Sequence, residues 1–200
     1  MTRRATATRK SKETNIAISL NVDGTGKAVV KTGIPFLDHM LTLLATHGLC
    51  DVTVKATGDL EIDRHHTNED IGLVLGEALD HALNTRKGIA RMGWAYVPMD
   101  EALARAVVDI SGRPKLVLRD SRAVRTKPLT SSTAYSWGDA EHFLESFVQK
   151  SKITLHIDVL AGSDFHHTLE AVFKALGRAL EQATRLHPRV TGIPSSKGRL

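Results

Sequence analysis

The sequence contains a single cysteine, Cys50, so no disulfide bond can form within the chain. It contains no apolar run that approaches the roughly 20 residues needed to cross a bilayer. Its first residues, Met-Thr-Arg-Arg, lack the apolar segment of a secretory signal. These absences exclude a disulfide-stabilised secreted scaffold and a protein with membrane-spanning helices. We expect a cytoplasmic protein with no membrane partner, in which any metal site is built from histidine and carboxylate side chains.

Acidic residues are missing from the first twelve positions. The chain has 27 Lys and Arg against 22 Asp and Glu, which gives a net charge of +5. Five basic residues precede the first acid, Glu13, and they account for the whole excess: Arg3, Arg4, Arg9, Lys10 and Lys12. The rest of the chain is balanced, so its charge does not indicate a nucleic-acid partner. Residues 1–11 are therefore predicted to form a flexible basic arm.

Two stretches of the sequence repeat each other. His65-His66-Thr67-Asn68-Glu69 recurs as His166-His167-Thr168-Leu169-Glu170, and each stretch is followed by apolar residues at helical spacing. The two apolar stripes lie 101 positions apart, and so do Gly76 and Gly177. Matching glycines in matching stripes predict close helix packing at equivalent places. The repeat therefore predicts an internal duplication.

The hydrophobic periodicity predicts the same order of elements in each half. In the first half we expect strands over residues 16–22, 27–31, 52–56 and 60–64, a helix from Pro35 to Gly48, and a helix that begins at His65. In the second half we expect strands over residues 103–110, 115–118 and 153–159, a helix over residues 139–150, and a helix that begins at His166. Arg119–Trp137 is polar and is predicted to be a long surface loop.

With 42% hydrophobic residues, 200 residues are sufficient for a well-buried core. We predict an α+β fold of two duplicated ββαββα units, residues 12–91 and 92–188, followed by a loop over residues 189–200. The four helices are expected to form a layer between two four-stranded mixed sheets.

The repeated stretches are typical of metal sites. In a helix, His65 and Glu69 share one face, as do His166 and Glu170, whereas the second histidine of each pair points roughly 100° away. His39 and His142 occupy matching places on the preceding helices. Six histidines and two glutamates suffice for two sites of three nitrogens and one oxygen, which suits Mn, Fe, Co, Ni or Zn without selecting one. The alternative interpretation is that the histidine pairs only cap helices.

The second histidine of each pair is free to reach the other site, which suggests a crossed arrangement. In this hypothesis one metal binds His39, His65, Glu69 and His167, and the other binds His142, His166, Glu170 and His66. Crossing between subunits would couple assembly to metal binding. The remaining four histidines are interpreted as structural: His47, His81, His156 and His187.

Positive groups that suit an anion lie outside the repeated stretches. Arg91, Arg113 and Lys197 are the candidates. Arg113 lies in a Gly-Arg-Pro turn, and Lys197 lies between Ser196 and Gly198, where small residues permit close approach to phosphate oxygens. Each of them alone is also compatible with an ordinary surface charge. Glu13 corresponds to Glu101 when the turns at Gly24 and Gly112 are aligned, and either is a candidate acid or base.

From Lys12 to Leu200 the chain resembles the imidazoleglycerol-phosphate dehydratase family, in its monofunctional form. Besides the two repeated stretches, three segments carry the resemblance most clearly: Phe36–Leu41, Met99–Ala104 and Asp109–Pro114. Pro194–Gly198 belongs to the same pattern. Departures are small: Asn68 stands where the family often has an aliphatic residue, and the Arg119–Trp137 loop matches poorly.

The resemblance implies a dehydratase of histidine biosynthesis with two Mn²⁺ ions per active site, which converts D-erythro-imidazole-glycerol phosphate to imidazole-acetol phosphate and water. It also implies a homo-oligomer of trimers that assemble into a 24-mer, with sites at subunit interfaces. The implied metal ligands are His39, His65, His66, Glu69, His142, His166, His167 and Glu170. The implied substrate contacts are Glu13, Arg91, Arg113, Ser196 and Lys197.

The mechanism expected from this resemblance avoids direct removal of the C2 hydrogen, which is not acidic. An electron-rich imidazolate expels the C3 hydroxyl to give a diazafulvene, and loss of the C2 proton, assigned to Glu13, then gives an enol that becomes the ketone. Two alternatives remain open. A dinuclear metal hydrolase also uses histidines and carboxylates, and a non-catalytic metal-binding cage protein needs the eight ligands without the three cations.

Overall fold

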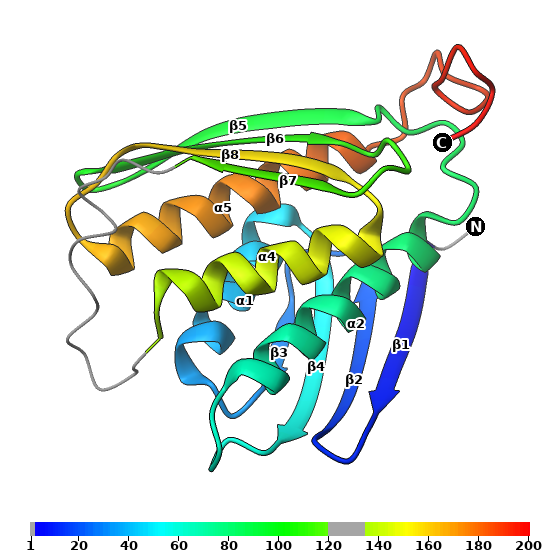
Figure 1. Cartoon of the computed structure of the whole chain (residues 1–200). Coiled ribbons are helices and arrows are strands. Elements are labelled where there is room, and N and C mark those ends of the chain that lie inside the picture. The colour runs from blue at the N-terminus through cyan, green and yellow to red at the C-terminus, as the bar shows by residue number, and fades with distance from the viewer. Residues whose placement is uncertain (1–2, 120–134) are drawn as a thin grey trace.

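The computed structural model describes residues 3–119 and 135–200 and has two four-stranded sheets (Figure 1). The first sheet has the order β1 (Arg4–Lys10), β2 (Thr14–Asn21), β4 (Asp51–Gly58), β3 (Ala28–Lys31). The second has the order β5 (Met92–Met99), β6 (Ala102–Asp109), β8 (Thr154–Ala161), β7 (Lys115–Arg119). In both sheets the last pair in this order is parallel and the other pairs are antiparallel. The matching orders confirm the predicted duplication.

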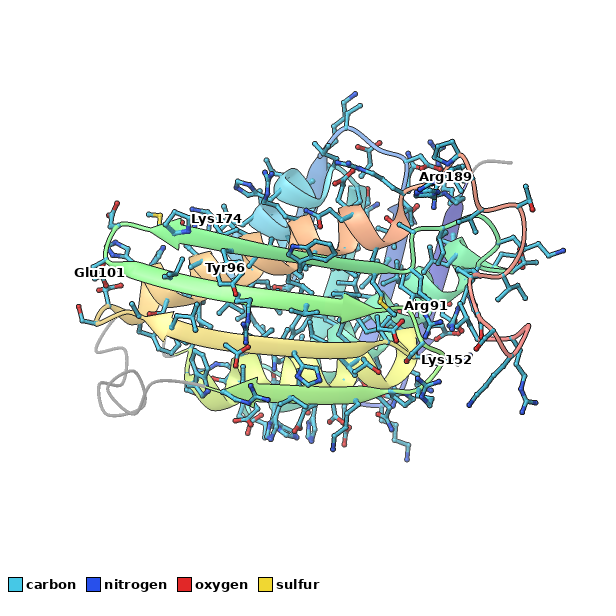
Figure 2. The ribbon with its side chains drawn as sticks, turned by 90° about the horizontal axis from the view of Figure 1, so that it is seen from above. Arg91, Tyr96, Glu101, Lys152, Lys174 and Arg189 are labelled. Atoms are coloured by element: carbon cyan, nitrogen blue, oxygen red, sulfur yellow. The ribbon has the colours of Figure 1, made fainter. Side chains whose placement is uncertain are left out.

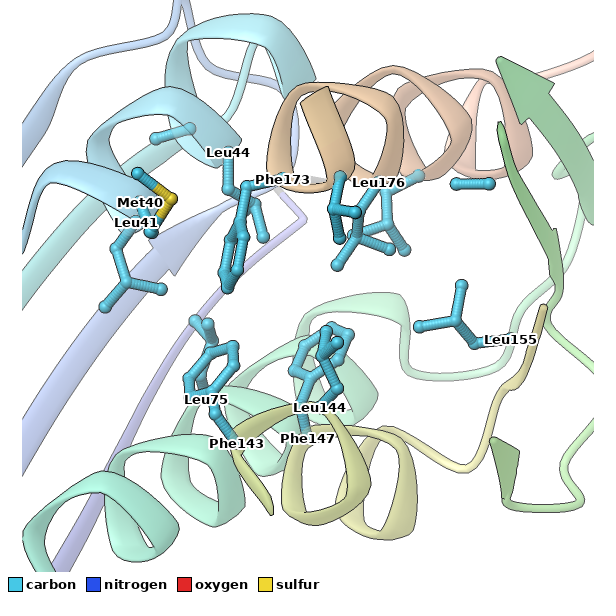
Figure 3. Close-up of a cluster of buried hydrophobic side chains, with 14 of the residues drawn as sticks. Met40, Leu41, Leu44, Leu75, Phe143, Leu144, Phe147, Leu155, Phe173 and Leu176 are labelled. Carbon is cyan, nitrogen blue, oxygen red and sulfur yellow. The ribbon is translucent and has the colours of Figure 1, made fainter. Parts of the chain in front are cut away.

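Four helices in the described residues form a layer between the two sheets (Figure 1). They are α1 (Pro35–Gly48), α2 (His65–Leu83), α4 (Trp137–Ser151) and α5 (Phe165–Thr184). Each helix contributes buried apolar side chains to one core, and Figure 3 shows Leu44, Leu75, Phe147 and Phe173 among them. The predicted fold class, α+β with helices between two mixed sheets, is confirmed. None of the helices in the described part of the chain is long and apolar enough to cross a membrane.

The two helix pairs in this layer approach closely at the matched glycines. A Cβ atom on Gly177 of α5 would lie 2.6 Å from the Leu44 carbonyl oxygen and 2.9 Å from the Gly48 nitrogen of α1. A Cβ atom on Gly76 of α2 would lie 2.9 Å from Lys150 Cβ of α4. The close packing predicted from the glycine spacing is therefore confirmed, and it pairs α1 with α5 and α2 with α4.

The N-terminal arm, which we predicted to be flexible, contains a strand. Residues 4–10 form β1, which pairs with β2 from Arg4 opposite Asn21 to Lys10 opposite Asn15. Arg9 also forms an ion pair with Asp70 of α2, with Nε 2.6 Å from the carboxylate. The periodicity missed this strand because the residue that it buries most deeply, Ala7, is small.

The predicted strand over residues 60–64 is also wrong, since these residues form a turn before α2. In each half the structure has three strands, a helix, a strand and a helix. Compared with the predicted ββαββα order, each half has one strand fewer between its two helices and one strand more at its start. The sequence analysis did not predict β5, which buries Gly93, Ala95 and Val97 and exposes bulky residues such as Trp94. Residues 120–134 of the predicted surface loop lie outside the described residues.

Candidate metal centre

His39, His166 and Glu170 form a cluster where α1 meets the start of α5. Both histidines present Nε2 to the same carboxylate oxygen, Glu170 Oε1, at 2.8 Å for His39 and 3.1 Å for His166. One ligand atom from each residue lies within 4.8 Å of the other two. Glu170 is buried, whereas both histidine side chains are almost half exposed. The cluster therefore offers two nitrogens and one oxygen to an ion that approaches from solvent.

The other half of the chain repeats this arrangement in a looser form. His142 of α4 and His65 of α2 have ring centroids 5.0 Å apart, and His65 Nε2 lies 3.6 Å from Glu69 Oε2. The Glu69 side chain is 45% exposed, against 10% for Glu170. Six of the eight predicted ligands are thus brought together within the chain as two groups of three.

The grouping differs from the predicted one, which placed His39 with His65 and Glu69, and His142 with His166 and Glu170. In the structure each upstream histidine meets the stretch of the other half. The reason is the helix pairing: α1 packs against α5 at Gly177, and α4 packs against α2 at Gly76. Sequence spacing alone does not reveal such long-range pairings.

One neighbouring group shapes this cluster and was missed by the sequence analysis. Lys174 Nζ lies 2.6 Å from Glu170 Oε2, one helical turn further along α5. Burial raises the pKa of Glu170, but hydrogen bonds from Lys174 and His39 outweigh it and lower the pKa to about 2. Glu170 is therefore ionised at neutral pH. The i,i+4 spacing of Glu170 and Lys174 was the available signal.

Asn68, one of the departures from the family pattern, joins α2 to α4. Its amide nitrogen donates to the Asp139 carbonyl oxygen at 2.8 Å, and its oxygen accepts from the Tyr135 hydroxyl at 2.9 Å. These bonds tie the start of α2 to the start of α4, which carries His142. Asn68 is 1% exposed, so these two hydrogen bonds lie in the core.

The second histidine of each pair meets a carboxylate outside its own stretch. His66 Nδ1 lies 3.0 Å from Asp59 Oδ2 and 3.9 Å from Glu13 Oε2. His167 Nδ1 lies 2.8 Å from Glu101 Oε2. The hydrogen bond with Asp59 raises the pKa of His66, and the one with Glu101 raises the pKa of His167. Asp59 was not among the candidate residues of the sequence analysis.

Neither histidine pair caps its helix. Asp164 accepts a hydrogen bond from the His167 backbone nitrogen at 2.9 Å and is the N-cap of α5. At α2, Asp63 accepts from the His65 backbone nitrogen at 2.6 Å. Because aspartates satisfy these backbone donors, the histidine rings face other groups, and the capping interpretation fails.

Glu13 and Glu101 were equal candidates in the sequence, but their surroundings differ. Glu101 Oε1 accepts from the backbone nitrogens of Asp164 at 2.8 Å and Ser163 at 3.2 Å. The hydrogen bond from His167, followed by these backbone donors, lowers the pKa of Glu101 to about 2. The Glu13 side chain is 57% exposed and reaches only to 3.9 Å from His66. Of the two, Glu13 is the one whose carboxylate has no hydrogen-bond partner among the described residues.

The candidate anion-binding residues lie far from these clusters. Figure 2 shows Arg91 at one end of the second sheet and Glu101 and Lys174 at the other. Arg91 forms a two-point ion pair with Asp109, at 2.7 and 3.0 Å, and donates to the Pro194 carbonyl oxygen at 2.8 Å. Arg113 is exposed and so are Ser196 and Lys197. The described chain thus does not bring its cations and its histidines into one site.

Comparison with known proteins gives a consistent result. The family model described as imidazoleglycerol-phosphate dehydratase matches residues 32–180. The imidazoleglycerol-phosphate dehydratase of Pelobacter propionicus is 50% identical over 200 residues, which is the full length of both chains. That of Mycobacterium sp. (strain KMS) is 50% identical over 201 residues and covers 100% of this chain and 97% of its own.

Two crystal structures of imidazoleglycerol-phosphate dehydratase also superpose on this chain. The Pyrococcus furiosus enzyme, in complex with (S)-C348, has a TM-score of 0.80 at 36% identity and covers 96% of this chain and 99% of its own. The Staphylococcus aureus enzyme has a TM-score of 0.77 at 37% identity and covers 91% of this chain and 99% of its own.

Proposed function

The chain belongs to the imidazoleglycerol-phosphate dehydratase family, a family of metal-dependent enzymes of histidine biosynthesis, and from this premise we propose that it converts D-erythro-imidazole-glycerol phosphate to imidazole-acetol phosphate and water with two Mn²⁺ ions. The observation that carries the proposal is the cluster of His39, His166 and Glu170, together with its counterpart in the other half. Duplicated clusters of imidazole and carboxylate offer donor sets that would suit a pair of divalent ions.

The donor set fits such ions. We propose eight ligands: His39, His65, His66, Glu69, His142, His166, His167 and Glu170. Two glutamates partly offset the charge of two divalent ions, and six neutral imidazoles supply nitrogen donors of the type that Mn²⁺ and its neighbours accept. When bound, the ions supply Lewis acidity, which favours the imidazolate form of the substrate ring without a strong base.

The chain's own residues supply proton transfer and alignment. The C3 hydroxyl would leave first, as water with the proton that the ring N–H gives up. Glu13 is proposed to take the proton from C2 afterwards, because its carboxylate is exposed beside His66 and has no hydrogen-bond partner among the described residues. Arg91, Arg113, Ser196 and Lys197 are proposed to bind the phosphate. Binding energy from this remote group would then align the ring with the metal centre.

The dimensions of the chain support a site shared between subunits. Arg91 precedes β5 and Glu101 follows it, and eight strand residues span roughly 27 Å. The length of α5 gives a similar separation between Arg91 and the metal cluster. The Arg91 backbone nitrogen donates to the Ala183 carbonyl oxygen, and the 13 residues from Glu170 to Ala183 along α5 span roughly 20 Å. A three-carbon phosphate substrate is far shorter. We therefore propose that the phosphate group and the ring are held by different chains of a homo-oligomer, such as the 24-mer of trimers that the family implies.

A direct assay tests the proposal. Protein stripped with a chelator and reloaded with Mn²⁺ should release imidazole-acetol phosphate from imidazole-glycerol phosphate, and the stripped protein should not. His166→Ala should lose this activity because it removes a nitrogen from the most compact cluster. A dinuclear hydrolase would instead cleave a phosphate ester or amide, and a cage protein would bind metal without turnover. Absence of the ketone from the loaded protein would refute the proposed function.

A further inference from the structure

His66 and His167 are each held through Nδ1 by a carboxylate that is not among the proposed ligands. Asp59 lies in the turn after β4 and accepts at 3.0 Å, and Glu101 lies in the turn between β5 and β6 and accepts at 2.8 Å. The two carboxylates do not occupy corresponding positions in the two halves. Different residues thus produce the same contact at both places.

This contact determines which ring nitrogen carries the proton. An ionised carboxylate only accepts hydrogen bonds, so a neutral histidine beside it carries its proton on Nδ1 and leaves the Nε2 lone pair free. Within residues 3–119 and 135–200, the only acid that approaches Nε2 of His167 is Asp100, at 3.7 Å, which is too far for a hydrogen bond. Nε2 is therefore the nitrogen that remains for a ligand.

We propose that Asp59 and Glu101 are positioning residues of the metal centre, which fix His66 and His167 as Nδ1–H tautomers and direct Nε2 to the ions. The proposal rests on the proposed function, because it assumes that these histidines bind metal. A carboxylate behind a ligating histidine orients its ring and strengthens it as a donor.

The surroundings of the two carboxylates predict different responses to the same chemical change. Glu101 Oε1 faces two backbone N–H donors, those of Ser163 and Asp164. In Glu101→Gln the amide oxygen must stay on these donors, so the amide nitrogen faces His167. The ring must then accept at Nδ1 and carry its proton on Nε2, which blocks metal binding at that nitrogen.

Asp59 is not constrained in this way. Its Oδ1 atom is buried and has no hydrogen-bond partner in the described structure, while Oδ2 faces His66. In Asp59→Asn the amide oxygen can therefore remain on His66, with the nitrogen at the unpaired position. We expect this variant to keep the Nδ1–H tautomer, whereas Asp59→Ala removes the acceptor altogether.

The test is a titration of Mn²⁺ into the assembled metal-free protein by calorimetry. Glu101→Gln and Asp59→Ala should each weaken metal binding about 10- to 100-fold, and Asp59→Asn should stay much closer to the unsubstituted protein. Glu145→Gln is the matched control, because Glu145 is exposed on α4 and lies away from both carboxylates. The melting temperature of the metal-free protein should be unchanged in Glu101→Gln, since its loop contacts survive.

Three results would overturn this inference without affecting the proposed function. The first is that Glu101→Gln and Asp59→Ala both bind Mn²⁺ as tightly as the unsubstituted protein, and the second is that Glu145→Gln loses as much Mn²⁺ affinity as they do. The third is that the loss of Mn²⁺ affinity is matched by a lower melting temperature of the metal-free variants. The last would identify a purely structural role. If Glu101→Gln does not fold, Asp59→Ala against Asp59→Asn decides the question. Failure of the unsubstituted protein to bind Mn²⁺ is a different result, which would refute the proposed metal centre itself and this inference with it.

Discussion

At the scale of single residues, the duplication produces pairs of side chains that share a sequence position but not an environment. Glu101 accepts hydrogen bonds from three residues, His167, Ser163 and Asp164, whereas the Glu13 carboxylate approaches only His66 among the described residues. Glu170 is buried beside Lys174, whereas Glu69 is half exposed. Residue types and spacing predicted these four glutamates as candidates. Their roles differ because of neighbours supplied by other elements, which spacing cannot reveal.

The freedom of Glu13 leads to a prediction for turnover. Glu13→Gln removes a proton acceptor and keeps the side chain's size, so kcat should fall by about 10²- to 10⁴-fold. The KM and the bound Mn²⁺ should change little, because Glu13 is not among the proposed ligands and lies 3.9 Å from His66. Steady-state kinetics with metal analysis of the same samples measures all three. Near-normal kcat would remove Glu13 from the mechanism.

At the scale of elements, prediction succeeded where the buried face is large and apolar. The long stripes of α2 and α5 were recognised, and so were the alternating strands β2 and β8. It failed for β1 and β5, whose inward faces use small residues such as Ala7, Gly93 and Ala95. The pairing of α1 with α5, which brings His39 to Glu170, also escaped prediction, because it depends on contacts between residues more than 100 positions apart.

The glycines at the helix crossings lead to a prediction for stability. A methyl group at Gly76 would lie 2.9 Å from Lys150 Cβ and from the Ser151 nitrogen, so α2 and α4 would have to separate. Gly76→Ala should therefore lower the free energy of unfolding by about 1–3 kcal/mol despite the better helix propensity of alanine. Gly177→Ala should act similarly through α1. Urea unfolding of the metal-free protein measures both.

Gly192→Ala is the control for this comparison, because a methyl group there meets no atom within 4 Å. Its unfolding midpoint should match that of the unsubstituted protein. If Gly76→Ala and Gly177→Ala behaved like Gly192→Ala, the helices would not be held at the separation that the structure shows, and the geometric basis for bringing His142 to His65 would be lost.

At the scale of the whole molecule, the chain separates its two kinds of functional group. The histidine clusters lie at the start of α2 and α5, whereas the Arg91 backbone nitrogen contacts the end of α5 through the Ala183 carbonyl oxygen. The sequence predicted both the candidate metal ligands and the candidate phosphate-binding residues, but it did not predict the distance between them. That distance depends on how the strands and helices are arranged in the folded chain. The distance between the candidate phosphate-binding residues and the candidate metal ligands supports the proposal that one site combines two chains.

This separation predicts that two inactive variants restore each other's activity when they assemble together. His166→Ala lacks a metal ligand but keeps the phosphate-binding end, and Arg113→Ala has the reverse defect. In mixed oligomers some sites combine the intact end of each chain, so co-expression with two different affinity tags should restore at most about a quarter of the normal activity per site. Each variant alone should be inactive.

The control for this experiment is a mixture of His166→Ala with Glu170→Gln. These two residues belong to one cluster, in which His166 Nε2 and Glu170 Oε1 lie 3.1 Å apart. Each chain of the mixture therefore carries one damaged copy of this cluster. A site takes this cluster from a single chain, and both chains carry a damaged one, so the mixture should remain inactive. Tandem purification could instead yield mixed oligomers of His166→Ala and Arg113→Ala that are equally inactive. In that case the phosphate and the ring are not held by different chains. The roughly 20 Å between Glu170 and Ala183 would then exclude Arg91 from binding the substrate's phosphate.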